Sequence, residues 1–307
     1  MKIVFLDAST LSDTDLSPIA ACGQFVTYPT STPEQARQRV ADCEVLNTNK
    51  VVVNEALLQA APCLKLICEA ATGVNNIDLE ACGRRGIPGR NVAGYSTASV
   101  VLHTFMHLLS LAGSAPWYDE YVKGGGYSRS PIFTNLDAPI SELDGKTIGI
   151  IGMGTIGSRV AKVAEAFGMT VCYYSTSGTR HCTDYPAMEL DELLKKSDVV
   201  SIHAPLNAAT RGLIGRGELE LMRHTAFLIN MGRGGIVDEQ ALSDAISDGT
   251  IAGAALDVFE AEPLPADSPL LHTSHPERLR FTPHTAWGSK EARERLVEAI
   301  AGHIKSL

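Results

Sequence analysis

Short apolar runs of strand length alternate with helix-length amphipathic segments along most of the chain. In the first third, the apolar runs fall at residues 2–6, 25–28, 45–46 and 64–68. The segments between them include residues 33–41, with proline in a first-turn position, and residues 54–60, with an asparagine as the cap. This alternation predicts a parallel sheet covered by helices on both faces.

A second alternating series follows a long apolar helix predicted over residues 98–112. We predict its strands at residues 147–151, 170–174, 199–203, 226–230 and 251–256. Helices are predicted at residues 156–167, 190–195, 239–247 and, closing the chain, 289–307. The pattern loosens at residues 123–126, Pro131 and Pro139, which favours a junction there between two doubly wound domains.

The length of the chain indicates two domains, and its charge disfavours a nucleic-acid partner. A chain of 307 residues is longer than one hydrophobic core usually supports, so two domains are expected. With 35 acidic against 26 basic residues, the formal charge is −9, the wrong sign for a surface that neutralises many phosphates. We therefore expect no nucleic-acid partner.

The N-terminus and the cysteines favour a cytoplasmic protein. The first apolar stretch is shorter than that of a signal peptide, and no apolar run reaches the length of a membrane span. The seven cysteines are odd in number and include no Cys-x-x-Cys pair, in a chain too large to need disulfides. We expect reduced thiols, a cytoplasmic location and no membrane partner.

One glycine-rich turn carries the strongest local signal. Gly152, Gly154 and Gly157 form a Gly-x-Gly-x-x-Gly pattern directly after a predicted strand and at the start of a predicted helix. The first glycine permits a tight turn, the second lets the backbone approach a pyrophosphate, and the third allows close contact of helix and strand. The free N–H groups of the helix N-terminus attract the anion. This context predicts a dinucleotide site rather than an ordinary glycine-rich turn.

The acidic residue that usually binds the adenosine ribose of NAD is missing. It is expected ~20 residues further on, at the end of the next strand. The chain has Ser175, Thr176, Ser177 and Gly178 there. The hydroxyls of Ser175 and Thr176 are candidates for bonding a ribose, whereas Arg180 is a candidate either for a 2′-phosphate or for a solvated loop position. We expect NAD and leave NADP open.

Several later segments resemble one known family. They include residues 71–78, 91–97, 230–235 (NMGRGG), 257–263 (DVFEAEP) and 282–287 (TPHTAW). Together they resemble the D-isomer-specific 2-hydroxyacid dehydrogenases over essentially the whole chain. The sequence from residue 142 onward, with residues 284–287 and 291–293, looks most like the glycerate dehydrogenase (hydroxypyruvate reductase) branch.

The resemblance implies an α/β architecture of two doubly wound parallel-sheet domains. A Rossmann dinucleotide-binding domain of residues 98–287 would be inserted in a flavodoxin-like substrate domain of residues 1–97 and 288–307. The substrate would lie in the cleft between them, and the long apolar helix would contribute to a homodimer contact. The implied reaction interconverts a small 2-oxo acid, hydroxypyruvate or glyoxylate being favoured, and its D-2-hydroxy acid by hydride transfer with a nicotinamide cofactor.

The resemblance assigns the catalytic roles to Arg233, Glu262 and His284, and the chemistry fits. The planar guanidinium of arginine pairs with both oxygens of the substrate carboxylate and stays charged. Histidine suits proton transfer to the carbonyl oxygen because its ordinary pKa lies near neutrality. A carboxylate beside the histidine would fix the ring and favour its protonated form. Each residue alone is commonly an exposed loop residue, but all three stand in matched motifs, in the order of the family.

The resemblance also assigns cofactor and substrate contacts. Asp257 would accept a hydrogen bond from the nicotinamide carboxamide, and the backbone amides of Thr72, Gly73 and Val74 would meet the substrate carboxylate, with Arg233 and His284. Plain turn chemistry is the alternative interpretation of these loops. The expected cofactor contacts are Gly152, Gly154, Thr155, Ile156, Gly157, Ser175, Thr176, His203, Pro205, Met231, Asp257 and Thr97.

Related activities remain as alternatives. The lack of a regulatory domain disfavours D-3-phosphoglycerate dehydrogenase, and Glu262 disfavours formate dehydrogenase, which has glutamine at that place. D-Lactate, phosphite and branched 2-oxo acid activities stay open. An NAD(H)-sensing interaction protein of the co-repressor type is a rival of another class, because such proteins share this fold and a similar trio. The absence of an extended tail or partner motif disfavours it.

Two histidines, His103 and His107, lie one helical turn apart, as in a zinc site. The glutamate of His-Glu-x-x-His is missing, and the sequence suggests no third ligand. The flanking residues are continuously apolar, which favours helix packing. We expect no metal site.

Overall fold

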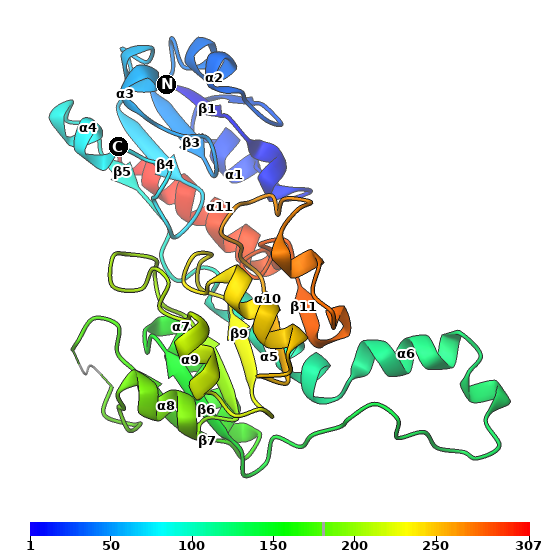
Figure 1. Ribbon diagram of the computed structural model, residues 1–307. Helices are drawn as coiled ribbons and strands as arrows, with labels where there is room; N and C mark the ends of the chain where they lie inside the picture. The colour runs from blue at the N-terminus through cyan, green and yellow to red at the C-terminus, as the bar shows by residue number, and fades with distance from the viewer. Residues whose placement is uncertain (180–181) are drawn as a thin grey trace. The chain divides into compact units, whose positions relative to one another are not determined.

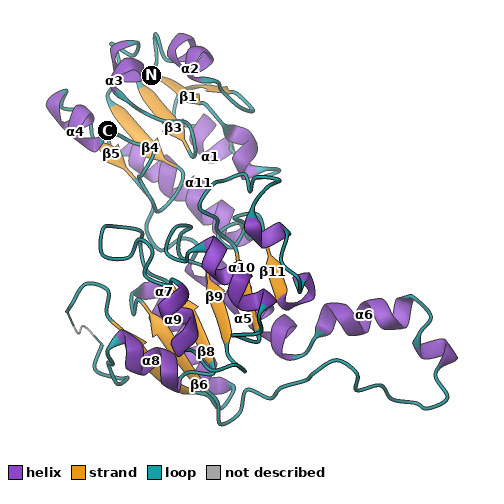
Figure 2. Ribbon diagram, viewed as in Figure 1, coloured by secondary structure: helices purple, strands orange, loops and turns teal. Residues whose placement is uncertain are grey.

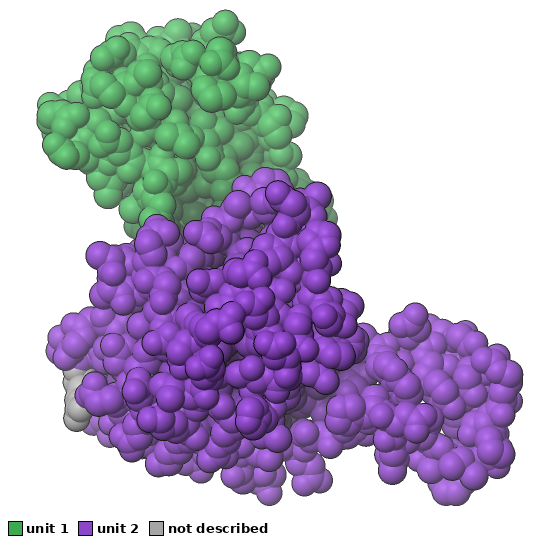
Figure 3. Space-filling model, in the orientation of Figure 1, with its two compact units in different colours: residues 1–96, 288–307 green, residues 97–287 purple. Residues whose placement is uncertain are grey.

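The computed structural model describes residues 1–179 and 182–307, which form two compact units (Figure 3). Unit 1 comprises residues 1–96 and 288–307, and unit 2 comprises residues 97–287. Each unit contains one sheet whose strand pairs are all parallel, with helices packed on it (Figure 2). The expected α/β class with two parallel sheets is confirmed. Arg180, the candidate 2′-phosphate ligand, lies outside the described residues.

Unit 1 has a five-stranded sheet in the order β2-β1-β3-β4-β5. Its strands are β1 (Lys2–Phe5), β2 (Gln24–Thr27), β3 (Val45–Thr48), β4 (Leu66–Glu69) and β5 (Gly89–Arg90). Its helices are α1 (Ser17–Ala20), α2 (Pro33–Arg39), α3 (Glu55–Gln59), α4 (Leu79–Arg84) and α11 (Lys290–Lys305), with the 3-10 turn η1 (Ala8–Leu11). This strand order is that of flavodoxin-like folds.

Local capping explains where the helices of unit 1 begin. Asn54 accepts a hydrogen bond from the amide of Leu57 at the start of α3, as the sequence predicts, and Thr32 forms a capping box at the start of α2. The closing helix α11 buries the apolar side of its amphipathic pattern against α1 and β4. The chain end is thereby part of the same core as its beginning.

Unit 2 has a six-stranded sheet in the order β11-β10-β9-β8-β6-β7. Its strands are β6 (Thr147–Ile151), β7 (Thr170–Tyr174), β8 (Val199–Ile202), β9 (Phe227–Asn230), β10 (Gly253–Leu256) and β11 (Leu279–Phe281). Its helices are α5 (Thr97–Ala112), α6 (Ala115–Lys123), α7 (Thr155–Ala166), α8 (Leu190–Lys196), α9 (Arg216–Leu221) and α10 (Glu239–Ser247), with the 3-10 turns η2 (Tyr127–Arg129), η3 (Pro269–Leu271) and η4 (Pro276–Arg278).

The strand order of unit 2 is that of a Rossmann sheet with a reduced third strand. Beyond β7, the segment between β7 and β8 adds only an isolated parallel bridge, Tyr173 to Ala187. Counting that bridge as the third strand gives the dinucleotide-binding order 3-2-1-4-5-6, with β11 as a seventh strand after β10. The order reverses between β6 and β8, and ligands bind at such a reversal in open α/β sheets.

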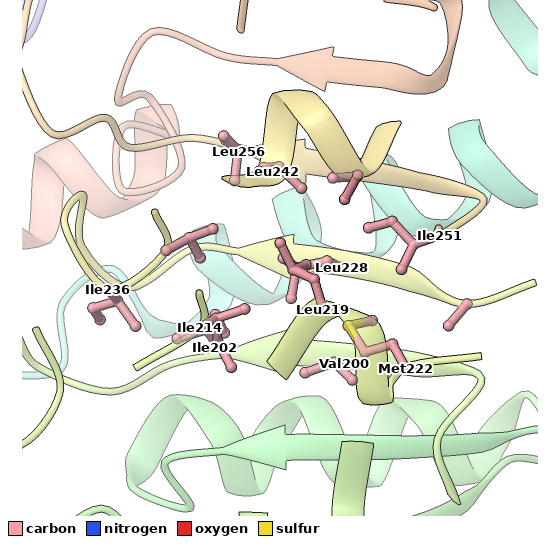
Figure 4. Close-up of a cluster of buried hydrophobic side chains, with 14 of the residues drawn as sticks. Val200, Ile202, Ile214, Leu219, Met222, Leu228, Ile236, Leu242, Ile251 and Leu256 are labelled. Carbon is pink, nitrogen blue, oxygen red and sulfur yellow. The ribbon is translucent and has the colours of Figure 1, made fainter. Parts of the chain in front are cut away.

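Both faces of this sheet are buried, which explains the continuously apolar strands. One face packs against α5 and α7 through residues such as Phe105, Leu108 and Val160. The other packs against α8, α9 and α10, where Leu228 and Val200 of the sheet meet Leu219 and Leu242 of the helices (Figure 4). The sheet is therefore held rigidly between two helix layers, and its strand ends can support a site.

The predicted junction near residues 123–139 is wrong. That segment lies inside unit 2 as an arm, residues 113–141, formed by α6, η2 and the irregular chain that returns to β6 (Figure 1). Helix α6 has no buried residue. Glycine and proline loosen the sequence here because the arm lies on no core, whereas the division between units falls at residues 96–97.

No single helix in the described residues is long and apolar enough to cross a membrane. Helices α5 and α6, which meet at an angle of 63°, pass that test of length and composition only as a bent pair. Most of the apolar side chains of α5 are buried against unit 2.

Candidate active site

The glycine-rich turn lies where the sheet order of unit 2 reverses. Gly152 follows β6 with a φ of +93°, and a Cβ there would lie 2.9 Å from the amide nitrogen of Ala204, which follows β8. A Cβ on Gly157 would collide with the carbonyl oxygen of Gly152. Gly154 faces open space and begins α7. The turn thus presents exposed backbone and a helix N-terminus, which fits a dinucleotide pyrophosphate.

A cavity next to this turn is rich in hydroxyl groups. Its lining consists of Gly152, Met153, Gly154, Tyr173, Ser175, Thr176, Ser177, Thr179, Cys182, His203 and Pro205. The cavity therefore brings together six of the expected cofactor contacts, which are the two glycines, Ser175, Thr176, His203 and Pro205. Thr155, Ile156 and Gly157 lie in the first turn of α7, outside this lining.

The expected ribose-binding end of the cavity contains no carboxylate among its lining residues. Ser175 Oγ donates to the carbonyl of Thr179 at 2.6 Å and lies 3.2 Å from Ser177 Oγ. Since its only proton is used in the loop, Ser175 offers an acceptor to a ligand. No fixed negative charge here opposes a phosphate on the ribose.

His203 enters the cavity as a neutral ring. Its Nε2 lies 2.8 Å from Ser201 Oγ, and its buried Nδ1 has no hydrogen-bond partner among the described residues. Burial lowers the pKa of His203 to about 3, so the ring carries no charge near neutral pH. His203 therefore lines the cavity without neutralising a phosphate.

Arg233 lies in the loop that follows β9. The side chain of Asn230 holds this loop, because its Nδ2 donates to the carbonyl of Arg233 at 2.9 Å and its Oδ1 accepts from the amide of Gly232 at 3.0 Å. Arg233 Nη1 donates to the Gly232 carbonyl at 2.8 Å. Within the described residues no carboxylate pairs with this half-buried guanidinium. The loop thus presents an uncompensated cation, which suits a carboxylate ligand.

His284 and Glu262 form a close pair. His284 Nδ1 lies 2.6 Å from Glu262 Oε2, and Glu262 Oε1 accepts from the amide of Phe259 at 3.0 Å. The side chains are 23% and 32% exposed, so the ring is oriented and still accessible. His284 has a φ of +54°, an uncommon backbone conformation outside glycine that often marks functional loops.

Asp257 anchors the loop that carries His284. Its Oδ1 accepts from the hydroxyl of Thr282 at 2.6 Å and from the amide of Thr285 at 2.8 Å, and its Oδ2 accepts from the amide of Ala286 at 2.9 Å. The side chain is buried. About one of its roughly four acceptor positions is left for a ligand. Asp257 therefore anchors the loop of residues 282–286.

Comparison with known proteins decides the family. Residues 105–286, which include the glycine turn, Arg233, Glu262 and His284, match the family described as D-isomer specific 2-hydroxyacid dehydrogenase, NAD binding domain. The chain belongs to this family. The resemblance drawn from the sequence motifs is thus confirmed.

Individual members of the D-isomer-specific 2-hydroxyacid dehydrogenases match almost the whole chain. The glycerate dehydrogenase of Methylorubrum extorquens is 36% identical over 306 residues, 99% of this chain and 95% of its own. The hydroxypyruvate reductase of Blautia hydrogenotrophica is 33% identical over 312 residues, 99% of this chain and 96% of its own. The structure of a D-lactate dehydrogenase from Aquifex aeolicus complexed with NAD and lactic acid superimposes with a TM-score of 0.85 at 29% identity, covering 100% and 95% of the two chains.

Membership of this dehydrogenase family fixes the reaction class. The chain is an oxidoreductase for a 2-oxo acid and 2-hydroxy acid pair with a nicotinamide cofactor. The glycine turn fits that cofactor, because Gly152 and Gly157 allow close backbone packing and Gly154 faces open space at the start of α7. When bound, it supplies or accepts the hydride.

The other residues expected to contact the cofactor or the substrate lie outside the hydroxyl-rich cavity. Thr72, Gly73 and Val74 belong to unit 1, in the loop after β4, where Thr72 Oγ1 donates to the carbonyl of Val92 at 3.0 Å. Met231 is buried in the loop before Arg233, and Thr97 is the first residue of α5. None of these three sites lines the hydroxyl-rich cavity.

Asn230, Thr282 and His107 hold the site in place and were not among the predicted site residues. Asn230 precedes the arginine loop and Thr282 precedes Pro283 and His284, so their place beside the motifs is a signal that was available. His107 gives no such signal. It is buried and bonds Thr282, whereas His103 bonds the carbonyl of Ser99 in its own helix. Among the described residues no three histidine, cysteine or acidic side chains gather as a metal site.

Proposed function

We propose that the protein reduces a small 2-oxo acid to its D-2-hydroxy acid, with hydroxypyruvate and glyoxylate as the favoured substrates. The observation that carries this proposal is the His284–Glu262 pair at 2.6 Å, in the same unit as the uncompensated Arg233 and the glycine cradle. The names of the relatives from Methylorubrum and Blautia support the choice of substrates.

Each side chain has one task in this reaction. Arg233 binds the substrate carboxylate and thereby places the neighbouring carbonyl. His284 gives the proton on Nε2 to the carbonyl oxygen as hydride reaches the carbon, so that one hydride and one proton convert the carbonyl group to the alcohol. Glu262 keeps the ring oriented through Nδ1 and stabilises its positive charge. In the reverse direction, neutral His284 accepts the hydroxyl proton.

Unit 1 has candidate substrate contacts of its own. The backbone amides of Thr72, Gly73 and Val74 would bond the substrate carboxylate. Asn76 ties this loop to its neighbours, because its Nδ2 donates to Glu69 Oε2 at 3.0 Å and to the carbonyl of Val51 at 3.2 Å. A fixed loop suits recognition of a carboxylate by main-chain donors.

The proposed cofactor range includes NADPH as well as NADH. Ser175, Thr176 and Ser177 stand where NAD-specific sheets place an acid, and the described residues that line this cavity include no carboxylate. Hydroxyls bond a ribose hydroxyl and tolerate a phosphate, so neither cofactor is repelled. Met231, Asp257 and Thr97 stay candidate contacts to the rest of the cofactor.

We place the protein in the cytoplasm as a homodimer. Its seven cysteines are free, which accords with a reducing compartment. The arm exposes Ile132 by 60%, Phe133 by 89% and Leu136 by 75%, and α5 exposes Leu102 by 60%. Exposed apolar side chains of this size are often buried in subunit interfaces.

Steady-state turnover tests the proposal. Hydroxypyruvate, glyoxylate, pyruvate, a branched 2-oxo acid and 3-phosphohydroxypyruvate are each assayed with NADH and with NADPH. The proposal expects the highest kcat/KM with hydroxypyruvate or glyoxylate, and activity with both cofactors. Preference for another acid would overturn the choice of substrate, and a lack of cofactor oxidation with every acid would favour a sensing role.

A further inference from the structure

A chain of hydrogen bonds links helix α5 to the loop of His284. His107 Nε2 lies 3.0 Å from Thr282 Oγ1, and Thr282 Oγ1 donates to Asp257 Oδ1 at 2.6 Å. The hydroxyl of Thr282 has one proton, which goes to Asp257, so its oxygen accepts from His107. His107 is therefore the Nε2–H tautomer, a donor at the end of a directed chain.

Because His107 and Asp257 are buried, the loss of any one hydrogen bond between His107, Thr282 and Asp257 is costly. His107 and Asp257 are 4% and 2% exposed, and burial lowers the pKa of His107, which keeps the ring neutral. A buried polar group that loses its partner keeps its desolvation cost. A second bond supports the same contact, since Arg280 Nε on β11 donates to Ser110 Oγ of α5 at 3.2 Å.

Asp257, the last residue of this hydrogen-bond chain, holds the backbone around His284. The carboxylate of Asp257 accepts from the amides of Thr285 and Ala286, and its carbonyl accepts from the amide of His284 at 2.8 Å. Asp257 thus contacts the loop on both sides of the left-handed residue His284. A backbone conformation of this kind persists only where the surroundings enforce it.

We infer that His107 is a positioning residue for the reaction, acting through Thr282 and Asp257 on the ring of His284. The inference rests on the proposed role of His284 as proton donor. Helix α5 is packed against β9, β10 and β11, so it gives the loop a rigid reference. Small displacements of a proton donor from its reacting geometry lower kcat strongly.

The inference is tested with two variants and their combination. His107→Leu removes the N–H donor and puts in its place an apolar residue that favours helix. Thr282→Val removes the hydroxyl and keeps nearly the same side-chain shape. Each is expected to lower kcat about 10-fold and to leave the KM for NADH within about twofold. The double variant is expected to be no slower than the slower single variant, because both break one chain.

Matched variants distinguish positioning from general stability. His107→Gln keeps an N–H donor and is expected to recover kcat to within about threefold of the parent, and Thr282→Ser should do the same. His103→Leu, one turn earlier on α5, should leave kcat unchanged. Thermal unfolding of every variant is measured in parallel, and Thr282→Val tests the same chain if His107→Leu does not fold.

Three outcomes would overturn the inference. One is an unchanged kcat in folded His107→Leu and Thr282→Val, a second is multiplication of the two losses in the double variant, and a third is a loss in His107→Gln as large as in His107→Leu. The proposed function fails separately, if His284→Ala retains full turnover. An inactive His284→Ala with an unaffected His107→Leu refutes only the positioning role.

Discussion

The Nδ1 atom of His284 lies 2.6 Å from Oε2 of Glu262. This bond occupies one ring nitrogen and leaves Nε2 for a substrate. Glu262 is itself held by the amide of Phe259. The orientation of the histidine is therefore set by a group that follows β10, whereas the histidine follows β11.

Glu262→Gln is predicted to lower kcat for reduction of a 2-oxo acid by about 10- to 100-fold. Glutamine can keep the hydrogen bond but not the charge that stabilises the protonated ring. Loss of that charge should slow the transfer of the proton from Nε2 of His284 to the substrate. Steady-state measurements of kcat at saturating NADH check this.

Glu260→Gln is the matched control for that change. Glu260 is exposed and lies two residues before Glu262. Its kcat should match that of the parent. An unchanged kcat in Glu262→Gln would remove Glu262 from the mechanism.

Arg233→Gln is predicted to lower kcat/KM for the 2-oxo acid by about 100-fold or more, since the bidentate charged contact with the carboxylate is lost. The KM for NADH should change by less than about threefold. Arg216→Gln, at an exposed arginine paired with Asp244, is the control. If kcat/KM fell equally for the 2-oxo acid and for NADH, Arg233 would support the fold and would not bind the substrate.

Glu69→Gln is predicted to stabilise the protein increasingly as pH rises from 5 to 8. Burial, with a smaller contribution from the charge of Asp7, raises the pKa of Glu69 to about 8, and its Oε1 is buried without a partner in the described residues. The folded state therefore holds a proton that the unfolded state releases from about pH 4.5 upward. Stability is complete below that pH and falls as pH rises through 8.

The difference in Tm between Glu69→Gln and the parent measures this effect. It should grow by a few degrees across the range, because about 1 kcal/mol shifts the Tm of a protein of this size by roughly 2–4 °C or less. Glu80→Gln, at an exposed glutamate paired with Arg84, should give a constant difference. A constant difference for Glu69→Gln as well would mean that Glu69 is ionised in the folded state.

Phe133→Asp is predicted to shift the protein from dimer to monomer at micromolar concentration. The side chain is 89% exposed on the arm, so a charge costs nothing in the isolated chain but must be desolvated in an interface. Light scattering coupled to size exclusion gives the molar mass. Asp119→Asn, on the exposed face of α6, is the control. An unchanged mass for Phe133→Asp would place the subunit contact elsewhere.

The sequence predicts most of the fold because both sheets are buried on both faces. Every strand and helix predicted from apolar runs is present, whereas β5, β11, α1, α4, α6 and α9 were not predicted. Arg280 stands in the middle of β11 and breaks its apolar run, and α6 buries nothing, so no amphipathic pattern marks it. The junction was misplaced for the same reason, since an arm without a core resembles a linker.

The motifs of the candidate site were visible because each follows a strand. Strand ends in a parallel sheet meet at one edge, so Arg233 and His284 could be expected in one region. The contact of His107 with Thr282 could not, because the two residues are 175 positions apart and neither has a local pattern that refers to the other. Tertiary packing alone brings them together.

Turnover by His284→Ala tests whether His284 is the proton donor. Initial rates are measured with hydroxypyruvate and glyoxylate at saturating NADH and NADPH, with His272→Ala, an exposed histidine of the same unit, as the control. We expect kcat of His284→Ala to fall by about 100-fold or more, with thermal unfolding and cofactor binding preserved, and the control to match the parent. Unchanged turnover of every 2-oxo acid by folded His284→Ala would contradict the account.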